Sequence, residues 1–410
     1  MRLLTFLLPL ALLISVGAAP FIAEAKSAPK SKTNERPTQV RDGLAEARLI
    51  DIYRLIGDGR TRDALKRAEQ LVADYPHFQL AQLVLGDLLS TRSRPIQNMG
   101  DVPAGLAQAG SQNLQALRAE AQLRIAAIKE RPPIDSIPSQ FVALSRRNKH
   151  AIAVDTAKAR LYLFKNTATG TRLLADYYIS VGKAGVSKDV EGDQRTPLGV
   201  YFITSKLDPK NLKDLYGSGA LPVNYPNVLD LRRGKTGGGI WLHGTPSTQF
   251  TRAPQATDGC VAVANPDLTR IIETVEIRTT PVLIGKNFKW VRSTGASSER
   301  QAFRDILQTW ARAKKRGQES ALMEFYASDF SAEGRDLDQF SAGLRAEVAK
   351  LGKRAVRLND VSLIRWTDEA DIMVATFGEV LAGNKTGRTV RQYWQQRNNV
   401  WKIIYEGAIG

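Results

Sequence analysis

The sequence predicts a multidomain protein with an α-helical N-terminal module, a mostly β domain in the middle and an α+β domain at the C-terminal end. The chain has 410 residues, which is more than one ordinary domain holds. Apolar residues repeat with a helical period up to about residue 130 and with the period of strands from about residue 150. After about residue 299, helical patterns are followed by a run of strand patterns.

The N-terminus has the anatomy of a secretory signal peptide. A short basic start precedes an almost wholly apolar stretch over residues 3–16, and small residues near positions 19 and 23–25 offer two cleavage sites. The apolar core, about 14 residues, is shorter than the roughly 20 residues that span a bilayer, so we expect no transmembrane span after cleavage. The sequence thus predicts a periplasmic or cell-envelope protein, with a signal peptide over 1–25 and a polar linker over 26–41.

The charge balance indicates an anionic environment. The chain has 58 Lys plus Arg against 41 Asp plus Glu, a formal net charge of +17. Export argues against nucleic acid as a partner, and the basic residues are not interleaved with aromatic ones as a nucleic-acid groove requires. An anionic envelope polymer or a membrane surface is favoured instead, with part of the charge forming a solvated face.

Residues 42–140 predict a helical module. Its apolar stripes cover about 44–55, 64–72, 80–89 and 114–128. The offsets of Ala64, Ala68 and Pro76 resemble one tetratricopeptide-type repeat. One such unit is too little for a solenoid, so we expect it to pack on its neighbour and to serve as a docking module for an envelope protein.

Residues 149–290 predict an all-β core with one short helix. Short apolar runs bounded by turn residues indicate strands. The predicted strands lie at 151–154, 160–164, 176–181, 199–203, 239–242 and 280–284, and the helix at 268–274.

The only cysteine, Cys260, follows His243 by 17 residues, and the two predict a nucleophile with its base. The preceding Asp-Gly marks a turn, so the thiol enters an element from a loop. His243 follows an apolar run and precedes Gly-Thr-Pro, which places it at a strand end. A structural role is the alternative, because free cysteines are often simply buried. An exported protein normally pairs its cysteines, however, so a lone thiol favours reactivity.

Four motifs in this domain resemble the L,D-transpeptidase catalytic domain of the YkuD type. They are Gly182-Lys183, the Glu-Gly-Asp-Gln-Arg-Thr-Pro-Leu-Gly stretch over 191–199, His243-Gly244-Thr245 and Asp258-Gly259-Cys260. The resemblance implies a β-sandwich-like fold whose cysteine thiolate attacks a carbonyl of a peptidoglycan stem peptide, without a metal or organic cofactor. It assigns Cys260 as the nucleophile, His243 as the base and the Gly244 carbonyl as the group that orients the imidazole.

Four more motif residues are candidates for substrate binding. Lys183 and Arg195 could bind substrate carboxylates, and their alternative is a solvated surface charge. Gly259 lets the backbone turn tightly, so that amide groups near the cysteine can face the oxyanion as it forms. Asp258, the fourth candidate, directly precedes Gly259 at this turn.

Two positions depart from the family pattern. Asp258 stands where members commonly carry a histidine, and Ala262 stands where they commonly carry an arginine. The other histidines, His77 and His150, lie outside the motifs, which leaves His243 as the base. With these two departures, the motif pattern is more similar to the branch of L,D-carboxypeptidases and crosslink-cleaving hydrolases. Transpeptidation and hydrolysis therefore both stay open. A non-catalytic envelope scaffold that binds peptidoglycan is the alternative from a different class.

Residues 299–410 predict helices and then antiparallel strands. The helices lie at about 302–310, 322–326 and 337–351, and the strands at 356–363, 371–380, 389–396 and 400–406. This pattern resembles the nuclear-transport-factor-like cone behind the catalytic domain of cell-shape L,D-carboxypeptidases. We assign it no catalytic role. Its aromatic residues either line a ligand pocket or pack in the core: Trp366, Tyr393, Trp394 and Trp401.

Overall fold

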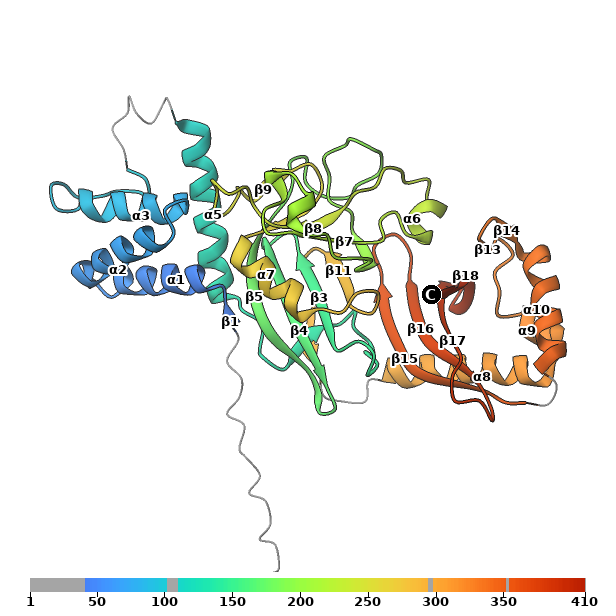
Figure 1. The fold of residues 1–410 in the computed structure, drawn as a ribbon. Helices are drawn as coiled ribbons and strands as arrows, with labels where there is room; N and C mark the ends of the chain where they lie inside the picture. Colours follow the sequence, from blue (N-terminus) through green and yellow to red (C-terminus); the bar gives the residue numbers. More distant parts are fainter. Residues whose placement is uncertain (1–40, 102–109, 294–297, 352–353, 410) are drawn as a thin grey trace, which may run out of the picture. The chain divides into compact units, whose positions relative to one another are not determined.

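The computed structural model describes residues 41–101, 110–293, 298–351 and 354–409 (Figure 1). The expected signal peptide, and the expected linker except its last residue, lie outside the described residues. The described part confirms the predicted fold class, with helices first, then a mostly β region, then an α+β region. None of its helices is both long and apolar enough to cross a membrane.

The helices predicted for the N-terminal module are present. They are α1 (Leu44–Gly57), α2 (Thr61–Asp74), α3 (Gln79–Ser90) and α5 (Ser111–Lys129). Their apolar stripes meet in one core, in which Leu49 and Ile52 of α1 pack with Leu71 of α2 and Val84 of α3. Helical spacing of apolar residues produces this core because residues three and four apart share a helix face.

The middle region is one hydrogen-bonded sheet that closes on itself. A bridge between Ile203 and Val223 joins the ends of the first and last strands of the path. The order is β6 (Gly199–Phe202), β11 (Pro281–Gly285), β3 (His150–Asp155), β4 (Arg160–Thr167), β5 (Gly170–Gly182), β10 (Val261–Val263), β8 (Trp241–His243) and β7 (Ala220–Pro222), while β1 (Arg41–Asp42) and β9 (Gln255–Thr257) pair with β5. Apart from β8, which the sequence predicts at 239–242, the strands of two or three residues are absent from the sequence prediction, among them β10.

The middle region also contains two helices and two short 3-10 turns. The helices are α6 (Val228–Arg232) and α7 (Asn265–Thr274), and the turns are η1 (Pro209–Asn211) and η2 (Asp214–Tyr216). A separate two-stranded sheet joins β2 (Ser136–Pro138) to β12 (Trp290–Arg292).

The C-terminal region is an antiparallel sheet covered by helices. The sheet runs in the order β15 (Val356–Trp366), β16 (Ile372–Leu381), β17 (Arg388–Arg397) and β18 (Val400–Ile409). The accompanying elements are α8 (Ser298–Arg316), α9 (Glu319–Met323), β13 (Ser331–Ala332), β14 (Arg335–Asp336) and α10 (Leu337–Leu351). Side chains alternate along each strand, so one face packs on the helices and the other packs on the middle region.

The aromatic residues considered for a cone pocket lie in packed surroundings. Trp394 is fully buried, and its ring meets Phe303 edge-on at 5.6 Å between centroids. Trp401 packs on the same phenylalanine at 5.2 Å. Trp366 and Tyr393 belong to the apolar cluster shared with the middle region. The structure therefore supports the core interpretation for these four residues.

Buried ion pairs attach the helices to the middle sheet. Glu46 of α1 pairs with Arg124 of α5 at 2.8 Å and with Arg160 of β4 at 2.6 Å, and Arg160 also pairs with Asp176 of β5 at 2.6 Å. These side chains are at most 5% exposed. Burial raises the pKa of Glu46, but the two arginines outweigh it and lower the value to about 2. These buried ion pairs therefore link the N-terminal helices to the middle sheet.

Replacing Glu46 with Gln should lower the free energy of unfolding by about 3–5 kcal/mol, because two buried guanidinium groups lose their shared carboxylate. Chemical denaturation measures the change. Glu69→Gln, on the exposed face of α2, is the matched control and should leave stability unchanged. A loss below about 1 kcal/mol would mean that the ion pairs do not attach the helices.

Candidate active site

The pairing of β8 with β10 brings His243 and Cys260 together. The two strands are parallel, with Val261 opposite Leu242 and Ala262 opposite His243. Cys260 directly precedes β10, so it is level with Trp241 on the neighbouring strand. Because side chains alternate along a strand, Cys260 and His243 belong to the same face of the sheet.

The imidazole of His243 is held by the residue that follows it. Its Nδ1 lies 2.6 Å from the carbonyl oxygen of Gly244. A carbonyl oxygen only accepts hydrogen bonds, so Nδ1 carries the proton and Nε2 keeps a lone pair. Burial lowers the pKa of His243 to about 4. The ring is therefore neutral at pH 7, as a general base must be.

The thiol of Cys260 is protonated at rest. Burial, together with the charge of Asp258, raises its pKa to about 11, against the amide of Trp241 and the charges of Arg252 and Lys188, which lower it. The Sγ donates a hydrogen bond to the carbonyl of Gly239 at 3.3 Å. Within the described residues, no hydrogen bond joins Sγ to His243. The thiol must turn from the Gly239 carbonyl toward Nε2 before it can transfer its proton.

Tyr216, at the end of η2, is a site residue that sequence reasoning missed. Its ring meets His243 edge-on, with 5.1 Å between ring centroids, and lies 4.8 Å from the ring of Trp241. Its carbonyl accepts a hydrogen bond from the amide of Gly244 at 2.9 Å. Burial and the charges of Cys260 and Asp258 raise its pKa, so the phenol stays neutral beside the thiol. No motif or spacing in the sequence connects Tyr216 to the two catalytic candidates.

Gly244 is required because another side chain occupies the space beside it. A β-carbon there would lie 2.0 Å from Oδ1 of Asn265. That oxygen accepts hydrogen bonds from the amides of Ser218 at 2.9 Å and Thr245 at 3.1 Å. The Nδ2 of Asn265 donates to the Thr245 carbonyl at 2.8 Å. Asn265, at the start of α7, thus fixes the loop that carries the Gly244 carbonyl and was also missed.

The remaining motifs form a packed support for Cys260. Thr196 Oγ1 donates to the carbonyl of Gly259 at 2.9 Å and accepts from the amide of Gly182 at 2.9 Å. Gly259 has φ +124°, and a β-carbon on it would lie 2.8 Å from the Arg195 carbonyl oxygen. The tight turn predicted at Gly259 is therefore present, and only glycine suits it.

The other candidates for substrate binding have partners within the chain. Lys183 Nζ lies 2.9 Å from Asp258 Oδ1, with both side chains about half exposed or more, so this ion pair adds little stability. Arg195 donates through Nη1 to the carbonyl of Val186 at 3.0 Å, on its own loop. Substrate contacts of Lys183, Arg195, Asp258 and Gly259 stay predictions.

The helical region holds the segment that connects β8 to β9. The ring of Phe250 packs on Tyr75 and Phe78, with centroids 5.1 and 4.6 Å away. Thr251 Oγ1 donates to Glu120 of α5 at 2.9 Å. The next residue, Arg252, lowers the pKa of both His243 and Cys260 through its charge. Sequence reasoning missed Arg252 because its loop carries no motif.

The other two histidines do not join the site. Nδ1 of His150 lies 3.1 Å from Glu276, and His77 contributes its backbone carbonyl to the amide of Phe250 at 3.1 Å. Among the described residues, no group of three or more His, Cys, Asp or Glu side chains is placed to hold a metal ion.

Two family models match the chain. The first, the L,D-transpeptidase catalytic domain named YkuD, covers residues 149–284 and therefore includes the face formed by β8 and β10. The chain contains an L,D-transpeptidase catalytic domain. The second, the C-terminal NTF2-like domain of Cds6, covers residues 302–407. The two matches confirm the resemblances drawn from the motifs and from the C-terminal strands.

Solved structures share this fold. The chain is similar to Bd1075 of Bdellovibrio bacteriovorus, with 24% identity and a TM-score of 0.57 over 67% of this chain and 98% of that one. It is also similar to Pgp2, the helical cell shape determining protein of Campylobacter jejuni, with 22% identity and a TM-score of 0.54 over 65% and 95%. At these identities the likeness concerns the fold alone. None of the curated proteins matches the chain significantly.

Alkylation of Cys260 by iodoacetamide should be slow at pH 7 and rise about tenfold per pH unit toward a midpoint near pH 11, because the thiolate is the reactive form. Mass spectrometry of the alkylated chain measures the rate, and circular dichroism confirms that the fold persists at each pH. A midpoint between pH 6 and 7 would show a thiolate–imidazolium pair at rest and contradict this description.

Phe250→Ala should slow the alkylation of Cys260 at pH 9 by about two- to tenfold, which corresponds to a rise of up to about one unit in the thiol pKa. The reason is that the segment carrying Arg252 loses its packing on Tyr75 and Phe78, between α2 and α3. Arg252→Met should act in the same direction, and Val400→Ala, at an exposed position, is the control. Unchanged alkylation rates in both variants would show that Arg252 does not influence the pKa of the Cys260 thiol.

Proposed function

We propose that this protein is an exported enzyme that modifies peptidoglycan stem peptides through a thioester on Cys260. The observation that carries the proposal is one thiol and one imidazole with an available Nε2 on a single face of adjacent strands, inside an L,D-transpeptidase domain. Export rests on the N-terminal sequence. The fold shared with a cell shape determining protein supports a role in cell shape.

The first half of the reaction forms the thioester. Nε2 of His243 accepts the Sγ proton while Sγ bonds to the substrate carbonyl carbon, and the π electrons of the carbonyl move to its oxygen. A backbone amide near Cys260 is the proposed donor to that oxyanion. The amide of Gly259 already donates to Thr257 Oγ1 at 3.2 Å. When the intermediate collapses, the C–N bond breaks and the imidazolium returns its proton to the leaving amine.

Proton transfer and attack must occur together. With pKa values of about 4 for His243 and about 11 for Cys260, moving the proton in the empty site is strongly uphill. Bond formation to the substrate consumes the thiolate as it appears, so the free ion pair need not accumulate. The neighbouring charges of Arg252 and Lys188 favour the developing negative charge on sulfur.

The acyl acceptor distinguishes two candidate activities. In the second half, the acceptor bonds to the thioester carbon, the C–S bond breaks, and the acceptor's proton passes through His243 to Sγ. An amine acceptor leaves a new C–N bond and gives transpeptidation, whereas water leaves a C–O bond and gives an L,D-carboxypeptidase or a crosslink-cleaving hydrolase. Ala262 supports the second candidate, because it replaces the common arginine and is only 2% exposed beside His243 and Ser180.

Incubation of the purified enzyme with disaccharide-tetrapeptide monomers and crosslinked dimers, followed by mass spectrometry, tests both activities. New dimers indicate transpeptidation, shortened monomers indicate carboxypeptidation, and loss of dimers indicates crosslink cleavage. Cys260→Ala should abolish every product, and His243→Gln should reduce the rate by at least about a hundredfold, since it removes the general base.

His150→Gln is the matched control, because this histidine pairs with Glu276 outside the site. It should keep the wild-type rate. Thermal unfolding of each variant establishes that the fold is intact. Processing by Cys260→Ala at the wild-type rate would end the thioester proposal.

A non-catalytic scaffold that binds peptidoglycan is the competing function. It predicts no covalent adduct between Cys260 and a carbapenem, and binding to isolated sacculi that does not depend on His243. An adduct of the expected mass on Cys260 in the wild type, absent from Cys260→Ala, would argue against the scaffold.

A further inference from the structure

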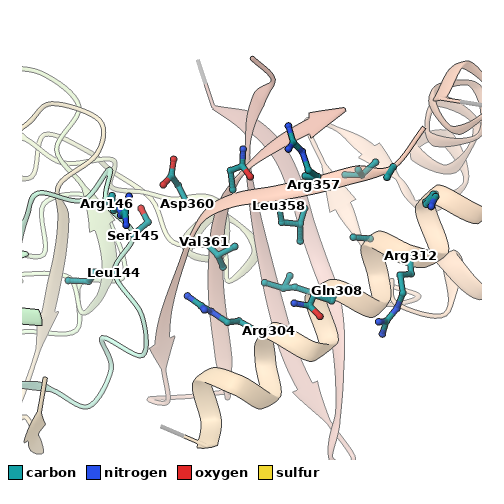
Figure 2. A pocket seen from close by; sticks show the side chains of 16 residues that line it. Leu144, Ser145, Arg146, Arg304, Gln308, Arg312, Arg357, Leu358, Asp360 and Val361 are labelled. Atoms are coloured by element: carbon teal, nitrogen blue, oxygen red, sulfur yellow. The ribbon is translucent and has the colours of Figure 1, made fainter. Parts of the chain in front are cut away.

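Positive charge gathers where the C-terminal sheet adjoins the catalytic domain. A cleft of about 990 Å³ lies between α8, β15 and residues 144–146. Figure 2 shows Arg146, Arg304, Arg312 and Arg357 around it. Asp360 is the only carboxylate among its described lining residues. The cleft is thus a basic surface open to solvent.

A smaller pocket adjoins this cleft. It measures about 290 Å³ and shares Ser145 and Asp360 with the cleft lining. Arg147 reaches it from the segment before β3, and Arg391 reaches it from β17. Guanidinium groups from the catalytic and the C-terminal domain therefore border one cavity.

Arg391 is the unusual member of this pair. It is 8% exposed, and its guanidinium carbon lies 3.3 Å from the centroid of the Phe202 ring of β6. Its Nε donates to Thr376 Oγ1 at 3.0 Å. Among the described residues, neither of its η nitrogens has a hydrogen-bond acceptor and no carboxylate lies within 4 Å, although burial lowers its pKa only to about 10. Arg391 thus keeps its charge in a desolvated position without an anion.

A buried cation normally has an anionic partner, because desolvation of a charge is costly. The aromatic ring compensates only part of that cost. Two hydrogen bonds position the segment that carries Arg147: Arg147 Nη1 donates to Thr389 Oγ1 of β17 at 2.8 Å, and Asn148 Nδ2 donates to the Thr279 carbonyl at 2.6 Å. Arg278 and the carboxylate of Asp360 also line the pocket. Arg391 and Arg147 are the two cationic donors that an external anion can meet.

We propose that this pocket binds one oxyanion, a carboxylate or a phosphate group, of a ligand whose other negative charges lie over the basic cleft. The planar guanidinium fork of arginine matches the oxygens of either group. The ligand is anchored between Arg391 and Arg147, and Arg304 and Arg357 attract its remaining charge. This site contains neither Cys260 nor His243, and it stands whether or not the proposed acyl transfer is correct.

Isothermal titration at low salt tests the site with two probes, inorganic phosphate and a disaccharide-tetrapeptide that carries carboxylates but no phosphate. Using the Cys260→Ala variant as background prevents turnover of the peptide. Arg391→Met and Arg147→Gln should each weaken binding of the preferred probe by at least about tenfold, the loss expected when a charged hydrogen-bond partner is removed. Arg172→Gln, exposed on β5, is the control and should bind like the background protein.

The probe that binds more tightly identifies the source of the anion. Absence of millimolar or tighter binding by both probes would overturn the proposal, as would equal affinities in the background protein, Arg391→Met and Arg147→Gln. Because Arg147 is exposed, its variant keeps the test decisive even if Arg391→Met folds poorly.

Thermal unfolding separates ligand binding from a purely structural role of Arg391. Without added anion, Arg391→Met should unfold at the same temperature as the parent protein or higher, since it removes a desolvated charge. Added anion should raise the unfolding temperature of the parent and leave the variant unchanged. A variant that unfolds several degrees lower and still gains the full anion effect would show that Arg391 only packs on Phe202.

Discussion

The parallel pairing of β10 with β8 is the contact on which the rest of the site depends. It places Ala262 opposite His243 and so puts Cys260 on the face that carries the imidazole. A shift of one residue would move Cys260 to the other face, because side chains alternate along a strand. Two close contacts restrain this register: Asn265 fills the space beside Gly244, and Thr196 holds the Gly259 carbonyl. The strand register that puts Cys260 and His243 on one face therefore depends on the same close contacts that require glycine at positions 244 and 259.

Burial determines the electrostatic state of the site. It holds His243 and Cys260 neutral, at pKa values of about 4 and about 11, so these two side chains form no ion pair with each other at rest. Charges farther out adjust this balance: Asp258 disfavours the thiolate, whereas Arg252 favours it. Arg252 belongs to a segment that Phe250 ties to the helices, and buried ion pairs at Glu46 attach these helices to the sheet. The helical region is thus part of the scaffold of the site as well as a candidate docking module.

The C-terminal domain uses both faces of its sheet. One face builds the domain's own core with α8 and α10, and the other completes the apolar core of the catalytic domain through residues such as Val374 and Ile404. Where that second face ends, the apolar contact gives way to Arg391 and the basic cleft. A surface used for packing between domains therefore also provides the walls of the anion pocket.

The sequence alone determined the longer strands and every described α-helix except the five-residue α6, because apolar periodicity is a local property of consecutive residues. It also identified Cys260, His243 and Gly244, since turn residues and family motifs surround them. Most strands of two or three residues escaped prediction because so short a run carries no period. One of them, β10, forms through its pairing with β5 and β8. Tyr216, Asn265 and Arg252 entered the site only through the tertiary structure, which joins segments that no motif connects. The protonation state of the pair was likewise decided by burial, which depends on how the whole chain packs around it.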